Sequence, residues 1–599
     1  MRVILTGFMG AGKTTVGRLL ARHLGWAFLD LDELVTLAAG RSIPDLFAAE
    51  GEAGFRAREA EALATALALE RVVIATGGGT VLAPANRERL AREPWVFWLT
   101  APVAELARRL EGDAGRPLLA TPGAGDGAAA GHGPEETRGR RLAERIASLL
   151  AAREAAYAAV ARYRIPTEGR DPARVAADIL ALLPGTVLPG NGRVAGGAAR
   201  GDAPPAPPSP PQDTGLVVTA GSHRYPVWVR PGALGDLAGL LAASGEAGLG
   251  PAGGDPGGRA PVALVVADPV VAALYGSTVR QALAEAGFRV HQAIVPPGEE
   301  AKSLGWAQYL YDRLLDAGAG RDAWVWALGG GVVGDLAGFV AATYMRGLAF
   351  AQLPTTLLAQ VDASVGGKVA VNHPRAKNLI GAFHHPRLVV ADPRSLLTLP
   401  GRTYRCGLAE MVKHALLDSP AAVAELEGAL AALRARDPGV LAPLIAASIG
   451  VKARYVALDP DERGPRAHLN LGHTFAHALE AATGYRVPHG EAVAAGLCLA
   501  TALSARLGLC DPALARRVEE LIGQLDLPTT LAEAAGRSEV APPPAAALLD
   551  RLQHDKKKRG GRVRFVLIRA PGRVEVRGDV PPELVAELVE RSLAGRPAL

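Results

Sequence analysis

The sequence predicts an α/β protein built from two unequal units. Short apolar runs that end in glycine alternate with helical stretches over residues 1–183 and again over residues 214–400, which is typical of parallel sheets covered by helices. Residues 184–213, between them, are rich in Pro, Gly and Ala. After residue 400 the apolar spacing becomes mainly helical. We therefore expect an α/β domain, a linker, and a second part with one α/β lobe and one mainly helical lobe.

Length and composition narrow the class of protein. A chain of 599 residues is too long for a single core, and contents of 49% hydrophobic and 21% charged residues are typical of soluble globular proteins. The net charge of +5 is mild and the basic residues are dispersed, so we expect anionic small ligands and no nucleic acid. The isolated Cys406, Cys498 and Cys510 predict neither a disulfide framework nor a cysteine zinc site.

Two features of the sequence bear on where the protein is located. The chain has no run of about 18 apolar residues, so we expect no membrane span. A glycine-rich motif begins almost at Met1, which leaves no room for a signal peptide. We therefore expect a cytoplasmic protein.

The first motif is a phosphate-binding loop. Residues 7–14 match G-x-x-x-x-G-K-[ST] and lie between an apolar run and a helical stretch. Backbone N–H groups of such a loop face phosphates, Lys13 adds a positive charge, and Thr14 can bind Mg²⁺. The context of strand, loop and helix predicts a nucleotide-binding site.

Polar residues follow the next apolar runs. Asp30 and Asp32 end the second run and are either partners of Mg²⁺ and a hydroxyl group or helix caps. Arg56 comes early in a predicted helix, where it either binds a ligand or faces solvent. A later strand runs into residues 77–79, three glycines that suit close backbone contact with a small ligand.

Residues 1–183 resemble shikimate kinase. The resemblance implies that Asp32 and Lys13 are catalytic, that Thr14 binds Mg²⁺, that Arg116 is a lid arginine near ATP and that Arg109 lies near adenine. It implies ATP contacts from Gly10, Ala11, Gly12, Lys13, Thr14 and Thr15, and shikimate contacts from Asp32, Arg56, Gly78, Gly79 and Arg153.

This first domain departs from the family between Arg116 and Arg153, where the lid is longer and rich in Gly and Ala. One alternative is a gluconate- or nucleotide-type kinase, but Arg56 with Arg153 favours an acceptor that carries a carboxylate. The other is a degenerate module kept for binding, against which the intact Lys13, Thr14 and Asp32 argue.

Residues 184–213 form the predicted linker. They have almost no apolar anchors and cannot bury enough surface to fold. Residues 204–211, PPAPPSPP, favour stiff polyproline II, with an SH3-type ligand as the functional alternative.

The second unit opens with residues 217–232, which alternate as in a hairpin. Later a strand runs into residues 329–331, three glycines followed by a helix, so backbone N–H groups can meet a pyrophosphate. Asp362, Lys368, Lys377 and Asn378 then cluster in a polar, glycine-broken segment. They indicate an anion site, although exposed lysines are more often only solvated.

Residues 466–491 hold four of the chain's 13 histidines: His468, His473, His477 and His489. His473 and His477 are four residues apart and share one face of a helix. They are either a pair of zinc ligands or residues with packing and capping roles. No Glu follows His473, which excludes the H-E-x-x-H protease pattern.

Residues 217–575 resemble 3-dehydroquinate synthase. The resemblance implies that Zn²⁺, or another divalent metal such as Co²⁺, is held by Glu410, His473 and His489. It implies NAD contacts from Asp268, Glu299, Lys302, Gly331, Val332, Val333, Gly334, Asp335, Thr355, Thr356, Lys368 and Lys377. It implies substrate contacts from Arg346, Asp362, Lys368, Asn378, Lys413, Lys452, Arg466, Asn470, His477 and Lys557, the last within a run of three lysines.

The same resemblance assigns further roles. Glu462 and His477 would handle protons, Lys413 would be catalytic, and His468 keeps a structural role. Arg346 would reach the phosphate in a neighbouring subunit, which implies a homodimer. Pro465 is a local departure, because the family usually has an apolar residue there.

The implied reactions are phosphorylation of shikimate and cyclisation of 3-deoxy-D-arabino-heptulosonate 7-phosphate to 3-dehydroquinate. These are separate, non-consecutive steps towards chorismate and aromatic amino acids. A rival for the second unit is a glycerol-dehydrogenase-like enzyme or another sugar phosphate cyclase, but Lys452 and Arg466 favour a carboxylated substrate. The expected domains are a kinase (1–183), the linker (184–213), an NAD-binding lobe (214–400) and a helical zinc- and substrate-binding lobe (401–599).

Overall fold

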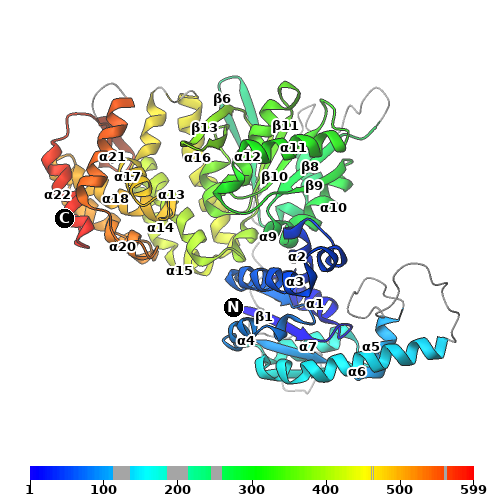
Figure 1. Cartoon of the computed structure of the whole chain (residues 1–599). Coiled ribbons are helices and arrows are strands. Elements are labelled where there is room, and N and C mark those ends of the chain that lie inside the picture. Colours follow the sequence, from blue (N-terminus) through cyan, green and yellow to red (C-terminus); the bar gives the residue numbers. More distant parts are fainter. Residues whose placement is uncertain (112–134, 185–213, 245–258, 461, 463, 559–562) are drawn as a thin grey trace, which may run out of the picture. The chain divides into compact units, whose positions relative to one another are not determined.

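The computed structural model describes residues 1–111, 135–184, 214–244, 259–460, 462, 464–558 and 563–599. Their contacts divide the chain into two compact units (Figure 1), Met1–Ser209 with Pro269–Ser277, and Pro210–Asp268 with Thr278–Leu599. Arg116 and residues 185–213 of the predicted linker lie outside the described residues.

A five-stranded parallel sheet forms the core of the first unit, in the order β2-β3-β1-β4-β5. Val3 and Leu5 of β1 face one hydrophobic cluster and Ile4 faces another, because successive side chains of a strand point to opposite faces. Both faces are therefore covered, which explains why the strands are apolar runs. The strands are β1 (Arg2–Gly7), β2 (Ala27–Asp30), β3 (Val72–Ala75), β4 (Val96–Thr100) and β5 (Tyr163–Pro166).

Helices connect these strands, as the alternating pattern predicts. They are α1 (Lys13–Leu24), α2 (Leu31–Ala39), α3 (Ile43–Ala68), α4 (Pro84–Ala91), α5 (Val103–Leu110), α6 (Glu135–Val160) and α7 (Pro172–Leu182), with a 3-10 turn η1 (Thr80–Leu82). The segment that groups with this unit carries α9 (Pro269–Val271) and η4 (Ala272–Gly276).

A seven-stranded mixed sheet forms one lobe of the second unit, in the order β6-β7-β14-β11-β10-β8-β9. The predicted hairpin is confirmed as the antiparallel pair β6–β7, and the other neighbours run parallel. The strands are β6 (Thr214–Ala220), β7 (His223–Val229), β8 (Val262–Ala267), β9 (Arg289–Ile294), β10 (Trp324–Gly329), β11 (Ala349–Pro354) and β14 (Leu388–Ala391), with a separate hairpin β12 (Lys368–His373) and β13 (Ala376–Phe383).

The helix α12 (Gly331–Thr343) packs closely on this sheet (Figure 1). A Cβ on Gly338 would collide with Val369 and lie 3.0 Å from the Phe350 ring. The small residue therefore lets the helix approach the strands. The lobe also contains α8 (Leu237–Ala243), α10 (Ser277–Glu285), α11 (Leu304–Asp316) and the short turns η3 (Ala233–Gly235), η5 (Glu299–Ala301), η6 (Tyr344–Arg346), η7 (Ala359–Ala363) and η8 (Pro393–Leu397).

The other lobe is mainly helical. One hydrophobic cluster joins Val218 and Val227 of the sheet to Leu416, Ile445 and Leu497 of the helices, so the two lobes share a core. The helices are α13 (Gly401–Asp418), α14 (Pro420–Gly428), α15 (Leu430–Ala435), α16 (Pro438–Leu458), η9 (Pro465–Asn470), α17 (His473–Ala482), α18 (His489–Arg506), α19 (Pro512–Gln524), α20 (Leu531–Gly536), α21 (Ala545–Lys558) and α22 (Pro582–Leu593). A hairpin, β15 (Phe565–Ala570) and β16 (Arg573–Arg577), completes it. The predicted α/β fold class is confirmed.

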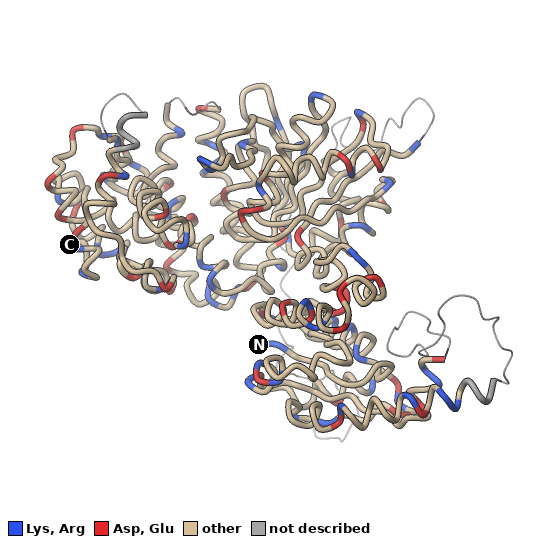
Figure 2. Tube along the Cα trace, in the orientation of Figure 1, with Lys and Arg blue, Asp and Glu red and all other residues tan. Residues whose placement is uncertain are grey.

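Three further properties concern membrane-spanning potential, charge and cysteines. Among the described helices α16 is long and apolar enough to cross a membrane, but 56% of its apolar window is buried inside the protein, and core helices pass the same test. Lys and Arg are interspersed with Asp and Glu along the described trace of both units (Figure 2). Cys406, Cys498 and Cys510 are free thiols.

Candidate active sites

The glycine loop of the first unit wraps around its own lysine. β1 ends at Gly7 and α1 begins at Lys13, whose Nζ donates to the carbonyls of Gly7 and Phe8, each at 2.9 Å. Gly12 before it has a φ of 92°, which favours glycine. Thr14 Oγ1 donates to Asp30 Oδ2 at 2.8 Å. The loop thus presents the first N–H groups of a helix, an ammonium group and a hydroxyl–carboxylate pair in one place.

This loop borders a hollow of about 640 Å³. Arg109 fixes one side of the hollow, because its Nη1 donates to the Gly10 carbonyl at 3.1 Å and its Nε donates to Glu105 at 2.7 Å. Among the residues predicted from the sequence, the hollow is lined by Gly10, Ala11, Gly12, Lys13, Thr14, Thr15, Asp32, Gly78 and Arg109.

The predicted acceptor residues meet at the glycines that follow β3. Arg153 Nη1 donates to the Gly78 carbonyl at 3.1 Å. The Arg56 guanidinium lies against Gly79 so closely that a Cβ there would collide with it. A Cβ on Gly77 would lie 2.7 Å from Asp32 Oδ1. Two arginines and one carboxylate therefore surround three glycines at the edge of the hollow.

Sequence reasoning missed Glu59, which holds Arg56 in place. Its carboxylate is 1% exposed and accepts from Arg56 Nη1 at 2.7 Å and from Thr80 Oγ1 at 2.6 Å. Burial opposes the charge of Arg56, but Glu59 and Glu52 outweigh it and raise the pKa of the guanidinium. The available signal was the i, i+3 spacing of Arg56 and Glu59 on α3.

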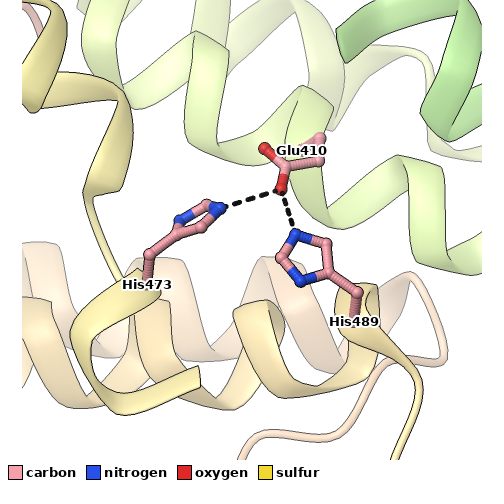
Figure 3. Close-up of side chains that lie close together, drawn as sticks. All are labelled: Glu410, His473 and His489. Atoms are coloured by element: carbon pink, nitrogen blue, oxygen red, sulfur yellow. Dashed lines mark ion pairs between the residues drawn. The ribbon is translucent and has the colours of Figure 1, made fainter. Parts of the chain in front are cut away.

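Glu410, His473 and His489 come together from three helices of the second unit (Figure 3). Glu410 lies on α13, His473 begins α17 and His489 begins α18. Glu410 Oε1 lies 3.4 Å from Nε2 of each histidine. Two ligands bound to a tetrahedral zinc ion at about 2.1 Å lie about 3.4 Å apart. The donor set and its spacing therefore fit a divalent metal with at least one open position.

The carboxylate of this triad is charged although it is buried. Glu410 is 1% exposed and forms an ion pair with Lys413, one helical turn further along α13. Burial raises the pKa of Glu410, but the Lys413 ammonium group and the contacts with the His473 and His489 rings outweigh it and hold the pKa well below its usual value. Burial also opposes the charge of Lys413, yet Glu410 and Asp362 raise its pKa. Both groups stay ionised beside the metal position.

His477 lies near the triad. Its ring centroid is 5.4 Å from that of His473 and 6.2 Å from that of His489. Among the described residues, no group of candidate metal ligands contains both His473 and His477, which counts against the two-ligand pair suggested by their spacing. A second residue missed from the sequence is Glu480, whose carboxylate lies 3.4 Å from His489 Nδ1.

Two cationic groups predicted to bind substrate, Lys452 and Arg466, are buried. Lys452 Nζ lies 2.8 Å from Asp362 Oδ1. Burial raises the pKa of Asp362, but Lys452 and Lys413 outweigh it and lower the pKa. Arg466 donates through Nη1 to the Pro460 carbonyl at 2.8 Å and through Nη2 to the Gly366 carbonyl at 3.3 Å. The predicted residues from α13, η7, α16 and η9 thus form a buried polar region.

The predicted NAD residues gather at the carboxyl edge of the sheet. Lys302 Nζ donates to Asp335 Oδ2 at 2.7 Å and to Asn378 Oδ1, and lies 3.8 Å from Glu299. Thr356 faces the glycine loop, because a Cβ on Gly330 would lie 3.1 Å from Thr356 Cγ2.

The remaining predicted NAD residues lie where the parallel strands of the same sheet end. Gly331, Val332, Val333 and Gly334 form the first turn of α12, directly after β10. The backbone N–H of Thr355 donates to the Gly329 carbonyl at 3.0 Å. Asp268 follows β8, the parallel neighbour of β10. The carboxyl edge of an open parallel sheet is the usual place for a ligand.

Three further predicted ligand-binding residues have other contacts or are exposed. Lys368 forms an ion pair with Glu462. Lys377 places its ammonium group 4.1 Å from the centre of the Tyr485 ring. Arg346 is exposed at the end of η6 with a φ of 71°.

Asn470 and Glu462 line a hollow of about 770 Å³. Lys557 lies in the last turn of α21, and its side chain is outside the described residues.

Comparisons with known proteins agree on two families. The family described as "Shikimate kinase" matches residues 9–184, "3-dehydroquinate synthase N-terminal" matches residues 292–406, and "3-dehydroquinate synthase C-terminal" matches residues 407–558. A curated relative, the 3-dehydroquinate synthase of Pelotomaculum thermopropionicum, is 45% identical over 373 residues, which are 62% of this chain and 95% of the relative.

Two of the solved structures found to be similar are a synthase and a kinase. ValA, the 2-epi-5-epi-valiolone synthase of Streptomyces hygroscopicus with NAD⁺ and Zn²⁺ bound, is 28% identical and covers 63% of this chain and 99% of its own, with a TM-score of 0.53. The shikimate kinase of Acinetobacter baumannii in complex with shikimate is 36% identical and covers 30% of this chain and 91% of its own, with a TM-score of 0.27.

Proposed function

This chain belongs to the 3-dehydroquinate synthase family and carries a shikimate kinase domain ahead of the synthase, and from this premise we propose two reactions on one polypeptide. The first is ATP-dependent phosphorylation of shikimate to shikimate 3-phosphate. The second is the NAD- and metal-dependent cyclisation of 3-deoxy-D-arabino-heptulosonate 7-phosphate to 3-dehydroquinate, with release of phosphate. Both belong to the shikimate pathway.

In the kinase, we propose that N–H groups of the glycine loop and Lys13 hold the phosphates of Mg²⁺-bound ATP, with Thr14 on the metal. Arg56 and Arg153 bind the carboxylate of shikimate, and Asp32 accepts the proton of its reacting hydroxyl group. The observation that carries this proposal is the convergence of Asp32, Arg56 and Arg153 on residues 77–79, beside the nucleotide hollow.

In the synthase, Glu410, His473 and His489 would hold Zn²⁺ or Co²⁺. When bound there, the metal would supply Lewis acidity for a substrate hydroxyl group, and NAD would supply reversible hydride transfer. The 3.4 Å separation of Glu410 Oε1 from Nε2 of each histidine carries this assignment.

The other synthase residues bind and orient the substrate. Lys413, Lys452 and Arg466 provide positive charge for a phosphorylated and carboxylated molecule. His477, whose ring lies 5.4 Å from that of His473, and Glu462, which pairs with Lys368, would move protons.

We also propose that the synthase part forms a homodimer, that the chain is cytoplasmic, and that its domains are residues 1–183, 214–400 and 401–599 with a linker between the first two. Arg346 and its neighbour Met345 are both exposed and both have positive φ values, which supports a surface contact in which Arg346 reaches a second copy. Light scattering after gel filtration measures the mass; a monomer at assay concentration contradicts the dimer.

The purified full chain should be assayed for both reactions. We expect ADP formation that requires shikimate, and phosphate release from the heptulosonate without net NADH. Accumulation of NADH without phosphate release would instead identify a dehydrogenase. Absence of shikimate-dependent ADP formation, with nucleotide binding retained, would identify the kinase half as a binding module.

A further inference from the structure

We propose that Glu480 is a positioning residue of the metal site, whose carboxylate orients the His489 ring so that Nε2 faces the metal. This inference rests on the proposed metal assignment of Glu410, His473 and His489. It adds a residue that the predicted ligand set does not include.

Glu480 belongs to the same helix face as His473. On α17 the positions of His473, His477 and Glu480 are i, i+4 and i+7, so two helical turns separate the ligand from the carboxylate. The Glu480 side chain is 13% exposed. It therefore points towards the site rather than into bulk solvent.

His489 lies between two carboxylates. Its Nε2 is 3.4 Å from Glu410 Oε1, on the metal side, and its Nδ1 is 3.4 Å from Glu480 Oε1 and from Glu480 Oε2. A carboxylate only accepts hydrogen bonds, and a neutral imidazole carries one N–H. With that proton on Nδ1, facing Glu480, the lone pair of Nε2 faces the metal position.

The two metal-binding histidines are supported differently. His473 Nδ1 lies 3.1 Å from the Leu471 carbonyl, which belongs to the backbone. His489 relies on a charged side chain, which both orients the ring and makes it a stronger ligand. A substitution of Glu480 therefore removes the hydrogen-bond partner of His489 Nδ1 and leaves all three metal ligands and the backbone unchanged.

The test measures Zn²⁺ affinity of the metal-free full chain against a competing chelator. Loss of such an outer partner typically lowers metal affinity about 10- to 100-fold, and we expect a loss in this range for Glu480→Ala. Glu480→Gln should lose less, because its amide oxygen still accepts from Nδ1 but carries no charge. The visible absorption spectrum of the Co²⁺-loaded Glu480→Ala protein should also change, because the ring is no longer oriented.

Two control variants distinguish a failure of the Glu480 proposal from a failure of the metal assignment. Glu427→Gln removes a carboxylate that pairs with Arg517 at 2.7 Å and should leave metal affinity unchanged. His473→Ala should lose most of the affinity; if it does not, the proposed metal site is wrong.

If His473→Ala behaves as expected while Glu480→Ala and Glu480→Gln bind Zn²⁺ as the wild type does, with unchanged Co²⁺ spectra, the role of Glu480 is refuted. His477, Glu480 and His489 also form a candidate ligand group of their own. Loss of a second bound Zn²⁺ in Glu480→Gln, with the first retained at full affinity, would overturn the positioning role in favour of that second site. If Glu480→Ala fails to fold, the near-isosteric Gln variant decides.

Discussion

At the scale of single residues, buried carboxylates hold the cations of both sites in position. Glu59 keeps Arg56 against residues 77–79, and Glu410 keeps Lys413 beside the metal ligands. A buried charge that loses its partner costs several kcal/mol, typically about 3–5. Each carboxylate therefore fixes the position of its cation before any ligand arrives.

Glu59→Gln tests this for the kinase. The amide still accepts from Thr80 but no longer neutralises Arg56, so we expect the KM for shikimate to rise about tenfold, or about 1.4 kcal/mol, with a smaller effect on kcat. Steady-state kinetics measure both. Glu52→Gln is the matched control, because Glu52 contacts the same guanidinium at 3.1 Å but is 53% exposed, and exposed pairs contribute little. Equal effects of the two substitutions would contradict the role of burial.

The residues that sequence patterns could not identify act through another side chain. Glu59 and Glu480 match no motif, because each contacts an arginine or histidine of the site rather than the ligand. Glu410 is far upstream of His473, so spacing alone could not pair them, and the family resemblance supplied that pairing. By contrast, the phosphate-binding loop around Lys13 could be predicted from its motif alone, because its function depends on consecutive residues.

At the scale of elements, small residues let three helices meet closely enough to share one metal site. Gly490, the second residue of α18, lies against α13, since a Cβ there would collide with the backbone of Cys406. Gly496 lies against the carbonyl of Gly472, just before α17, in the same way. The separations between Glu410, His473 and His489 depend on these two approaches.

Gly490→Ala should push α18 away from α13. Overpacking of this kind costs about 1–3 kcal/mol of stability, and we expect Zn²⁺ affinity to fall as His489 moves. Urea unfolding of the metal-free chain and Zn²⁺ titration measure the two effects.

Gly450→Ala is the control, because in the described part of the chain no atom outside the local helix backbone lies within 4 Å of its Cβ position in α16. Helix propensity should there add about 0.5–1 kcal/mol. Unchanged stability and metal affinity in Gly490→Ala would show that the helices can separate at no cost.

Other elements could be predicted only in part. Strands that end in glycine and the hairpin β6–β7 have short-range signals, and the structure contains them. Residues 353–386 read only as a polar, glycine-broken segment. The structure divides them between the end of β11, a π-helical turn and the hairpin β12–β13, and their order depends on tertiary packing, such as that of Val369 against Gly338.

At the scale of the whole molecule, each unit has its own sheet, its own core and its own set of polar groups. The two proposed reactions are not consecutive, so neither site needs the product of the other. We therefore predict that the sites work independently within one chain.

Lys13→Ala should lower shikimate-dependent ADP formation at least about 100-fold, because a positioned cation on the phosphates is lost, and should leave phosphate release from the heptulosonate unchanged. His473→Ala should do the reverse. Coupled assays on the same preparations measure both rates. Loss of both activities in either variant contradicts independence.

Chelation gives a second test at this scale. Treatment with a chelator followed by Mg²⁺ replenishment should abolish only the cyclisation, and added Zn²⁺ or Co²⁺ should restore it. Elemental analysis of the treated protein verifies the removal. Full cyclisation by a protein shown to contain neither metal would refute the metal assignment.

The hydrogen bonds of Lys13 within its own loop restrict which ligands can bind to its ammonium group. Its ammonium group already donates to two carbonyl oxygens, those of Gly7 and Phe8, so an incoming molecule must offer stronger acceptors before the lysine turns towards it. Charged phosphate oxygens are such acceptors, whereas the hydroxyl groups of a nucleoside are not. We therefore expect polyphosphates, but not adenosine, to displace these two contacts, so that charge rather than the base is the first property that the site recognises.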